Sequence, residues 1–152
     1  MDRQHTMQIL IERETRKRDD ALAAWRDAQR AAENASQQAD SLVQYREEYR
    51  TRWSAQFAKS APIEIVRCYH GFVQRLDQAI TTQQATARQS ADRVAAALKV
   101  LRHREMKLAT VRRLIERRQQ AALQVAQRRE QKTFDEAAQR LGWAARGGLA
   151  AN

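Results

Sequence analysis

Apolar and small residues recur along the first third of the chain with the spacing of a coiled-coil helix. From Trp25 they follow one another at intervals of 3, 4, 3, 4 and 3 residues, through Ala28, Ala32, Ala35, Ala39 and Leu42. Met7, Ile11 and Ala21 precede this series, and Tyr45, Tyr49, Trp53 and Phe57 extend it with larger side chains. Alternating steps of three and four place such residues in one stripe along a helix. The pattern predicts a long helix over about residues 4–58, whose alanines let a second helix approach closely.

A second series with the same spacing fills the rest of the chain. Its members are Val66, Tyr69, Val73, Leu76, Ile80, Ala87, Ala91, Val94, Leu98, Leu101, Leu108, Val111, Ile115, Ala122 and Val125. Gln83 and Gln84 interrupt it, as polar residues in a helix contact often do when they fix register. Gly142 directly after Leu141 is typical of a helix end. We therefore expect a second helix over about 63–141, followed by a flexible tail at 142–152.

The two series are separated by the only proline in the chain, Pro62. Proline breaks a helix interior but fits the first turn of a new helix, where its missing N–H has no partner. Ser60 is a suitable cap, and Glu64 is favourable in the first turn. The sequence predicts an all-α fold in which two long helices form an antiparallel coiled-coil hairpin. Residues 1–141 would make one domain, with its tip at 59–64 and the second helix longer.

The second helix should extend beyond the first. If the arms fold back at about residue 61, Met1 lies opposite Ala121, and the stretch to Leu141 projects by about 30 Å. An unpaired helix of that length is only marginally stable. We therefore expect another protein to contact its mixed-charge residues, which are Arg128, Arg129, Lys132, Phe134, Asp135, Glu136 and Arg140.

Near the tip, the second helix carries more apolar residues than one helix contact can cover. Ile65, Tyr69, Phe72, Leu76, Ala79 and Gln83 form one series, and Val66, Val73 and Ile80 form another beside it. Together they make a wide apolar arc. Two interpretations remain open: Trp53 and Phe57 cover the flank that holds Phe72 and Ala79, or this flank is an exposed docking patch.

Charge is uneven along the chain. The net charge is +10, and residues 97–118 hold eight Lys or Arg against Glu105 and Glu116. Such a stripe suits phosphate, but no aromatic residues alternate with the basic ones and no zipper follows them. We therefore favour a solvated or protein-facing helix over a nucleic-acid interface. A charged N-terminus, a single cysteine and no long apolar run predict a cytoplasmic protein.

Catalysis is not expected. Cys68 and His70 are two residues apart, which places them on opposite faces of a helix. His5, His70 and His103 lack metal-ligand spacing, and the chain has no glycine-rich phosphate loop. The sequence predicts a protein that is not an enzyme, without a metal, a cofactor or a small-molecule substrate.

The chain resembles the flagellar export protein family FliJ over about residues 7–140, and more distantly the stalk proteins of virulence type III secretion. Four segments carry the resemblance: Met7-Gln8 with Leu10-Ile11, Leu42-x-x-Tyr45-Arg46-x-x-Tyr49, Tyr69-x-x-Phe72-x-x-x-Leu76-x-x-Ala79-Ile80-x-x-Gln83, and Arg129-Glu130-Gln131-Lys132-x-x-Asp135-Glu136-Ala137. The chain departs from the family where Lys59-Ser60-Ala61 replaces a glycine that often precedes the second helix.

The resemblance implies a soluble component of the flagellar type III export apparatus, located in the cytoplasm and peripherally at the inner membrane. Its paired ends would enter a hexameric export ATPase ring as a stalk, in contact through the residues from Arg128 to Arg140, and promote ATPase activity. Its tip would dock on the cytoplasmic domain of the membrane export gate through Phe72, Leu76, Ala79 and Gln83. Export chaperones are further implied partners. The alternatives are a generic coiled-coil scaffold or chaperone, the equivalent stalk of a virulence secretion system and, last, a basic nucleic-acid-binding helix.

Overall fold

The computed structural model describes residues 2–150, which form two helices. Helix α1 spans Arg3–Phe57 and helix α2 spans Ile63–Ala150. They pack against each other, and the described residues contain no strand. This confirms the predicted all-α hairpin with a longer second helix. Contacts divide the chain into two units: the tip unit, residues 13–106, and the terminal unit, residues 2–12 and 107–150. The expectation of one domain over 1–141 stays a prediction.

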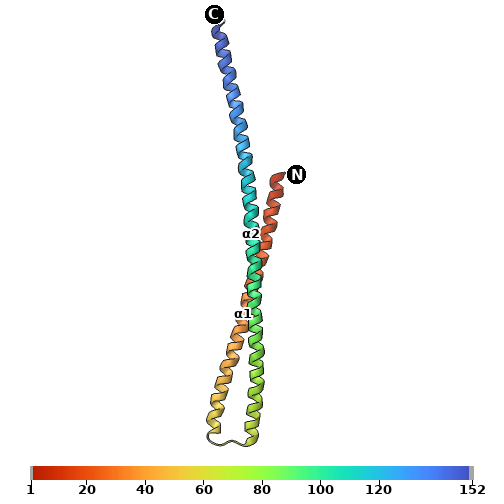
Figure 1. Ribbon diagram of the computed structural model, residues 1–152, viewed down its shortest axis with the longest axis vertical. Helices are drawn as coiled ribbons and strands as arrows, with labels where there is room; N and C mark the ends of the chain where they lie inside the picture. The colour runs from red at the N-terminus through yellow and green to blue at the C-terminus, as the bar shows by residue number, and fades with distance from the viewer. Residues whose placement is uncertain (1, 151–152) are drawn as a thin grey trace. The chain divides into compact units, whose positions relative to one another are not determined.

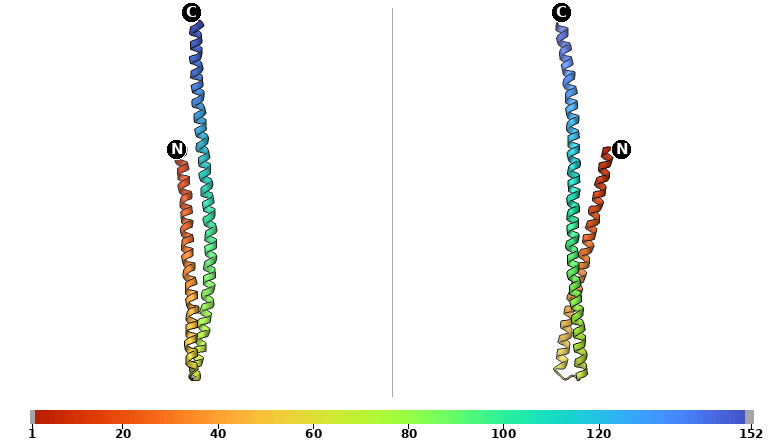
Figure 2. Two further views of the ribbon diagram at one scale, coloured as in Figure 1. Left: turned by 90° about the vertical axis from the view of Figure 1, so that its left-hand side faces the viewer. Right: turned by 45° about the vertical axis from the view of Figure 1, so that its right-hand side comes forward.

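In the tip unit, α1 and α2 run side by side in opposite directions (Figures 1 and 2). Cross-helix contacts fix their register: Gln83 reaches Gln38, Arg46 reaches Asp77, and Tyr49 packs on Phe72. The buried apolar residues are small on α1 and large on α2, namely Ala21, Ala35 and Ala39 against Leu76, Ile80 and Leu101. Alanine on one side leaves room for leucine and isoleucine on the other, so the helices bury one narrow apolar stripe.

Two predicted contact positions in the tip unit are wrong. Ala91 is exposed and Ser90 is half-buried in its place, because the steps from Gln83 through Ala87 continue to Ser90 and Val94. Tyr45 is 48% exposed, whereas Arg46 is half-buried. Arg46 follows Ala39 by seven residues, so the alternating spacing selects it over its aromatic neighbour.

The turn between the helices also differs from its prediction. The Pro62 carbonyl accepts the backbone N–H groups of Ile65 and Val66, at 3.1 and 3.3 Å, so Pro62 directly precedes α2 as its cap. Ser60 is not the cap. Its φ of 151° belongs to a region that favours glycine. Ser60 belongs to the Lys59-Ser60-Ala61 segment that replaces the family's frequent glycine, and its backbone conformation is one that glycine adopts more easily.

In the terminal unit, burial ends well before the helix does. Leu108 and Ile115 are 2% and 8% exposed, and Met7 and Ile11 on α1 are half-buried. Every residue from Glu116 to Gly148 is exposed. The prediction that Ala122 and Val125 continue the helix contact is therefore wrong, since α1 covers α2 only as far as Ile115.

Helix α2 does not end at Leu141. It continues through Gly142, Gly147 and Gly148 to Ala150. A glycine that ends a helix adopts a positive φ, and no described glycine does. The predicted tail is therefore helical over its described part, and Ala151 and Asn152 lie outside the described residues. Neither α1 nor α2, as far as they are described, is long and apolar enough to cross a membrane.

Candidate docking surfaces

Aromatic side chains from both helices meet near the tip. Tyr49 lies at the centre, with its ring 4.7 Å from Phe72 and 5.6 Å from Tyr69, centroid to centroid. Trp53 and Phe57 approach Tyr69 at 6.3 and 5.1 Å. Aromatic pairs at such distances attract beyond their burial alone. This aromatic cluster links α1 to α2 next to the short turn that connects them.

The cluster borders an open groove in the tip unit. Its lining residues are Tyr49, Trp53, Glu64, Ile65, Cys68, Tyr69, Phe72 and Arg75. Ile65 is 41% exposed and Cys68 is exposed. An apolar floor with one carboxylate and one guanidinium at its edge suits a protein side chain or a short peptide.

The structure divides the four predicted gate-docking residues between two environments. Leu76 is buried in the helix contact, and Gln83 is half-buried there. Phe72 and Ala79 lie on the flank, where Phe72 is half-buried against Tyr49 and Ala79 is exposed. The sequence left open whether Trp53 and Phe57 cover this flank or whether it is fully exposed. The structure differs from both, because Tyr49 covers Phe72 in part and Ala79 stays exposed. Gate docking through these residues stays a prediction.

Polar groups link the arms above the aromatic cluster. The Gln83 side-chain amide donates to the Gln38 side chain at 3.1 Å and to the Ala35 carbonyl at 3.4 Å. The Arg46 Nε lies 3.0 Å from the Asp77 carboxylate, an ion pair whose N–H and oxygen are not aligned as a hydrogen bond. Sequence reasoning noted Gln83 but missed the ion pair, which seven-residue spacing from Ala39 to Arg46 could have revealed.

A buried carboxylate occurs near the N-terminal end of the tip unit. Glu14 is 5% exposed and precedes the buried Ala21 by seven residues, so both lie on the same side of α1. One of its oxygens lies 3.7 Å from the Lys17 ammonium, and the other has no hydrogen-bond partner. Burial of a partly unsatisfied charge is costly. Glu14 is thus a locally destabilising residue that the apolar pattern of the sequence did not single out.

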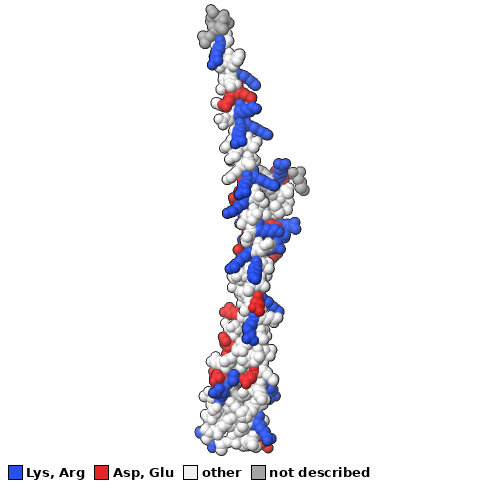
Figure 3. All heavy atoms as spheres, viewed as in Figure 1, with Lys and Arg blue, Asp and Glu red and all other residues white. Residues whose placement is uncertain are grey.

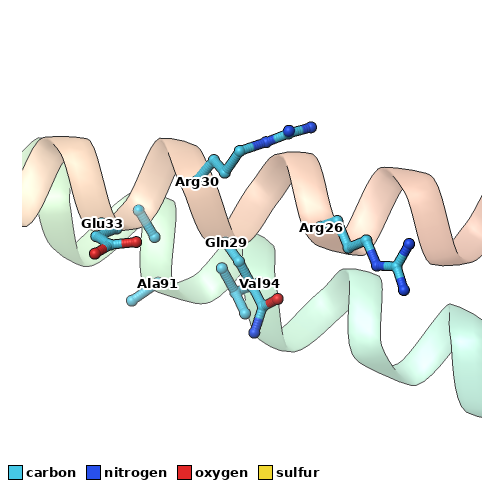
Figure 4. A pocket seen from close by; sticks show the side chains of 7 residues that line it. Arg26, Gln29, Arg30, Glu33, Ala91 and Val94 are labelled. Carbon is cyan, nitrogen blue, oxygen red and sulfur yellow. The ribbon is translucent and has the colours of Figure 1, made fainter.

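A second, shallow groove follows the alanine-rich part of the contact (Figure 4). Gln29 extends from α1 toward α2 beside Val94, and Arg30 points away and pairs with Asp27. Ala91 lines the groove from α2. The groove exists because small side chains leave space between two helices, and its lining shows no convergent set of reactive groups.

In the terminal unit, the seven residues predicted to contact an ATPase ring are all exposed. Phe134 is 73% exposed, and its neighbours on the same helix include Leu141 at 73% and Trp143 at 78%. Figure 3 shows both blue and red side chains along this stretch of α2. Within the described residues, every ion pair involves residues between Glu14 and Asp77. The seven residues are exposed and outside these ion pairs, and their contact with an ATPase ring stays a prediction.

Within residues 2–150, no group of three His, Cys, Asp or Glu side chains could hold a metal ion. Cys68 and His70 are both exposed and lie within one turn of α2, about 200° apart around the helix, so they do not converge.

Comparison with known proteins identifies the family. The family model described as flagellar FliJ protein matches residues 3–147. The chain belongs to the FliJ family. It is similar to the flagellar FliJ proteins of Escherichia coli K12 and Salmonella typhi, at 30% identity over 135 residues with each, which covers 89% of this chain and 90% of each relative. Membership in the FliJ family makes the chain a component of flagellar protein export, and it confirms the resemblance found in the sequence.

Proposed function

We propose that this FliJ family protein is a stalk and adaptor of the export apparatus, without enzymatic activity of its own. Its C-terminal helix enters the hexameric export ATPase ring and promotes ATPase activity. Its tip contacts the cytoplasmic domain of the export gate, and the protein also serves export chaperones. This requires a cytoplasmic protein that associates peripherally with the inner membrane at the export apparatus.

One observation carries the proposal: α2 stays helical from Glu116 to Gly148 although every residue there is exposed. A single helix without tertiary contacts is marginal in water, because most helical stability in proteins comes from packing. Exposed Phe134 and Leu141 add apolar surface that a monomer would rarely leave uncovered. The segment is therefore best understood as a helix that awaits a protein partner.

The contact chemistry favours a partner that the helix can enter and leave. Arg128, Arg129 and Lys132 lie beside Asp135 and Glu136. Mixed charge supports specific pairing, and exposed ion pairs contribute less than about 1 kcal/mol each. Such contacts are weak enough individually to permit several orientations inside a ring.

The test is ATPase stimulation. Truncation after Ala126 should leave the helix contact intact and abolish stimulation of the purified export ATPase. Reversal of charge at Arg128 and Arg129 should reduce stimulation partially, and more at low salt than at high salt, because salt screens exposed charges. If the truncated chain still stimulates fully, the ring contact lies elsewhere, with the basic stretch from Lys99 to Arg118 as the next candidate.

Gate docking is supported by a separate observation, the open groove that borders the aromatic cluster of the tip unit. Phe72→Ala should weaken co-purification of the chain with the cytoplasmic domain of the export gate. Phe72 is only half-buried, so the melting temperature should fall less than for a buried aromatic residue. Gln78→Ala, an exposed change on the same helix, is the matched control and should leave the association intact.

A further inference from the structure

Large apolar side chains are exposed at the end of the tip unit. Ile63, the first residue of α2, is 70% exposed, and Ile65 is 41% exposed. Pro62, directly before them, is exposed as well. Neighbouring exposed apolar residues often mark a contact surface. The open groove beside the aromatic cluster accounts for only part of this surface, because Ile65 lines the groove and Ile63 does not.

Basic residues surround this apolar end. Residues 49–76 contain five Lys or Arg and a single acidic residue, Glu64. The five basic residues are all exposed and lie outside the ion pairs of the described chain: Arg50, Arg52, Lys59, Arg67 and Arg75. In the view of Figure 3, the end of the tip unit is mostly uncharged and has blue side chains at its margins. Its charge complements a surface that is apolar inside and negatively charged outside.

An anionic lipid bilayer has these two properties. Its headgroups attract Lys and Arg, and its acyl boundary accepts apolar side chains. Trp53 and Tyr69, half-buried in the aromatic cluster next to the turn, are of residue types that favour the interface between membrane and water.

The position of Ile63 also favours a bilayer over a protein. Figure 1 shows the turn at one end of the tip unit, where it joins α1 to α2. A protein would need a concave site to cover a projecting turn, whereas lipid chains rearrange around an inserted side chain.

We infer that the end of the tip unit inserts shallowly into a bilayer that contains anionic lipid. Ile63 and Ile65 enter the acyl boundary, and Lys59 and Arg67 contact the headgroups. So small a contact is weak and reversible, and stable anchoring takes a second contact. The inference goes beyond the proposed function, because the lipid contact requires no export gate.

The experiment measures sedimentation of the full chain with vesicles, in the absence of other proteins. One set of vesicles is phosphatidylcholine, and the other is an equal mixture with the anionic phosphatidylglycerol. A polarity-sensitive fluorophore on Cys68, the only cysteine of the chain, reports which part of the chain meets the lipid. Cys68 follows Ile63 by five residues, about 7.5 Å along the helix. Brominated lipid quenches the fluorophore only if the tip reaches the bilayer.

Two tip variants separate the apolar contact from the charged one. Ile63→Ser should weaken binding to the mixed vesicles by about tenfold, because it removes an aliphatic side chain from the acyl boundary. Val100→Ser changes an aliphatic residue that is 52% exposed and distant in sequence from the turn, and it should stay within about twofold. Circular dichroism checks that each variant keeps its helices.

Lys59→Gln with Arg67→Gln should also weaken binding to the mixed vesicles by about tenfold, and should change binding to phosphatidylcholine little, because only the mixed vesicles carry the negative charge. Arg88→Gln with Arg93→Gln removes two exposed charges of α2 farther from the turn. This control should retain most of the binding.

Three outcomes would overturn the inference. The wild-type chain could fail to bind the mixed vesicles. It could bind while the fluorophore on Cys68 stays unquenched and Ile63→Ser binds equally well, which would assign the lipid contact to another part of the chain, such as the basic residues 97–118. Ile63→Ser could instead weaken association with the purified cytoplasmic domain of the export gate without lipid, while no vesicle binds, which would make a protein the occupant. None of these outcomes depends on ATPase stimulation, so the proposed ring contact is tested separately.

Discussion

At the scale of single residues, burial separates side chains that look equivalent in the sequence. Leu76 and Ala79 are three residues apart in the same motif, yet Leu76 is 8% exposed and Ala79 is exposed. Leu76 therefore belongs to the helix contact, and its loss would confuse any test of docking. Variants that probe the gate should leave Leu76 in place and change Phe72 alone.

We predict that Leu76→Ala destabilises the protein by about 2–5 kcal/mol, because it removes transfer free energy and leaves a cavity. Urea unfolding followed by circular dichroism measures the change. Ala79→Ser, on the exposed flank, is the control and should shift the free energy of unfolding by less than about 0.5 kcal/mol. Equal stability of the two variants would show that Leu76 is not in the core.

Glu14 gives a prediction of the opposite sign. Its buried carboxylate has one oxygen without a partner and only a long contact to Lys17. Replacement of buried ions by apolar residues of similar volume is often neutral or stabilising, by about 1–4 kcal/mol. Glu14→Leu should therefore raise the melting temperature or leave it unchanged. Glu12→Leu, at an exposed position, should have little effect, and a large loss of stability in Glu14→Leu would mean that the charge has a partner in solution.

At the scale of the elements, the turn from Ala58 to Pro62 decides where α2 begins. The last backbone hydrogen bond at the end of α1 runs from the Lys59 N–H to the Gln56 carbonyl, and the Pro62 carbonyl accepts the first ones of α2. Ser60 carries the unusual φ that this reversal needs. A residue with a Cβ is strained there, at a cost of order 1–3 kcal/mol.

Ser60→Gly should accordingly stabilise the hairpin by about 1 kcal/mol, since glycine adopts that φ without a steric penalty. Thermal unfolding by circular dichroism measures the effect. The neighbouring Ala61→Gly is the matched control: Ala61 has no positive φ, so added freedom in the unfolded chain should destabilise it slightly. A higher melting temperature for Ala61→Gly than for Ser60→Gly would contradict this account of the turn.

At the scale of the whole molecule, stability and partner contact depend on different parts of the chain. Buried apolar residues occur from Ala21 to Ile115, and the proposed ring contact lies beyond them. Loss of the C-terminal part should therefore cost function before it costs folding. The FliJ family match extends over both parts, to residue 147.

Truncation after Ala126 should thus leave the midpoint of urea unfolding nearly unchanged, because every residue from Gln127 to Gly148 is exposed. Truncation after Arg104 removes the buried Leu108 and Ile115 and should destabilise by several kcal/mol, at about 2–5 kcal/mol for each large aliphatic residue lost. Urea unfolding of both truncated chains and the full chain tests this. Equal destabilisation by the two truncations would show that residues after Ala126 contribute to the core.

The sequence by itself determined the helices, the position of the reversal and the family. Heptad spacing from Trp25 to Leu42, the single Pro62 and the motif from Tyr69 to Gln83 are local patterns, so one chain suffices to find them. They identified the hairpin correctly, and the unequal lengths of its two arms predicted the exposed C-terminal residues.

Tertiary structure alone decided which residues of a wide apolar arc are covered. Leu76 is buried in the helix contact, and Phe72 is half-covered because the Tyr49 ring packs on it, which depends on register across the turn. Contact between helices likewise selected Arg46 over Tyr45 and Ser90 over Ala91. The end of α2 at Ala150, past three glycines, was not predictable from local preference either. Glycine permits a helix end without requiring one, so the backbone conformation at Gly142 had to be observed.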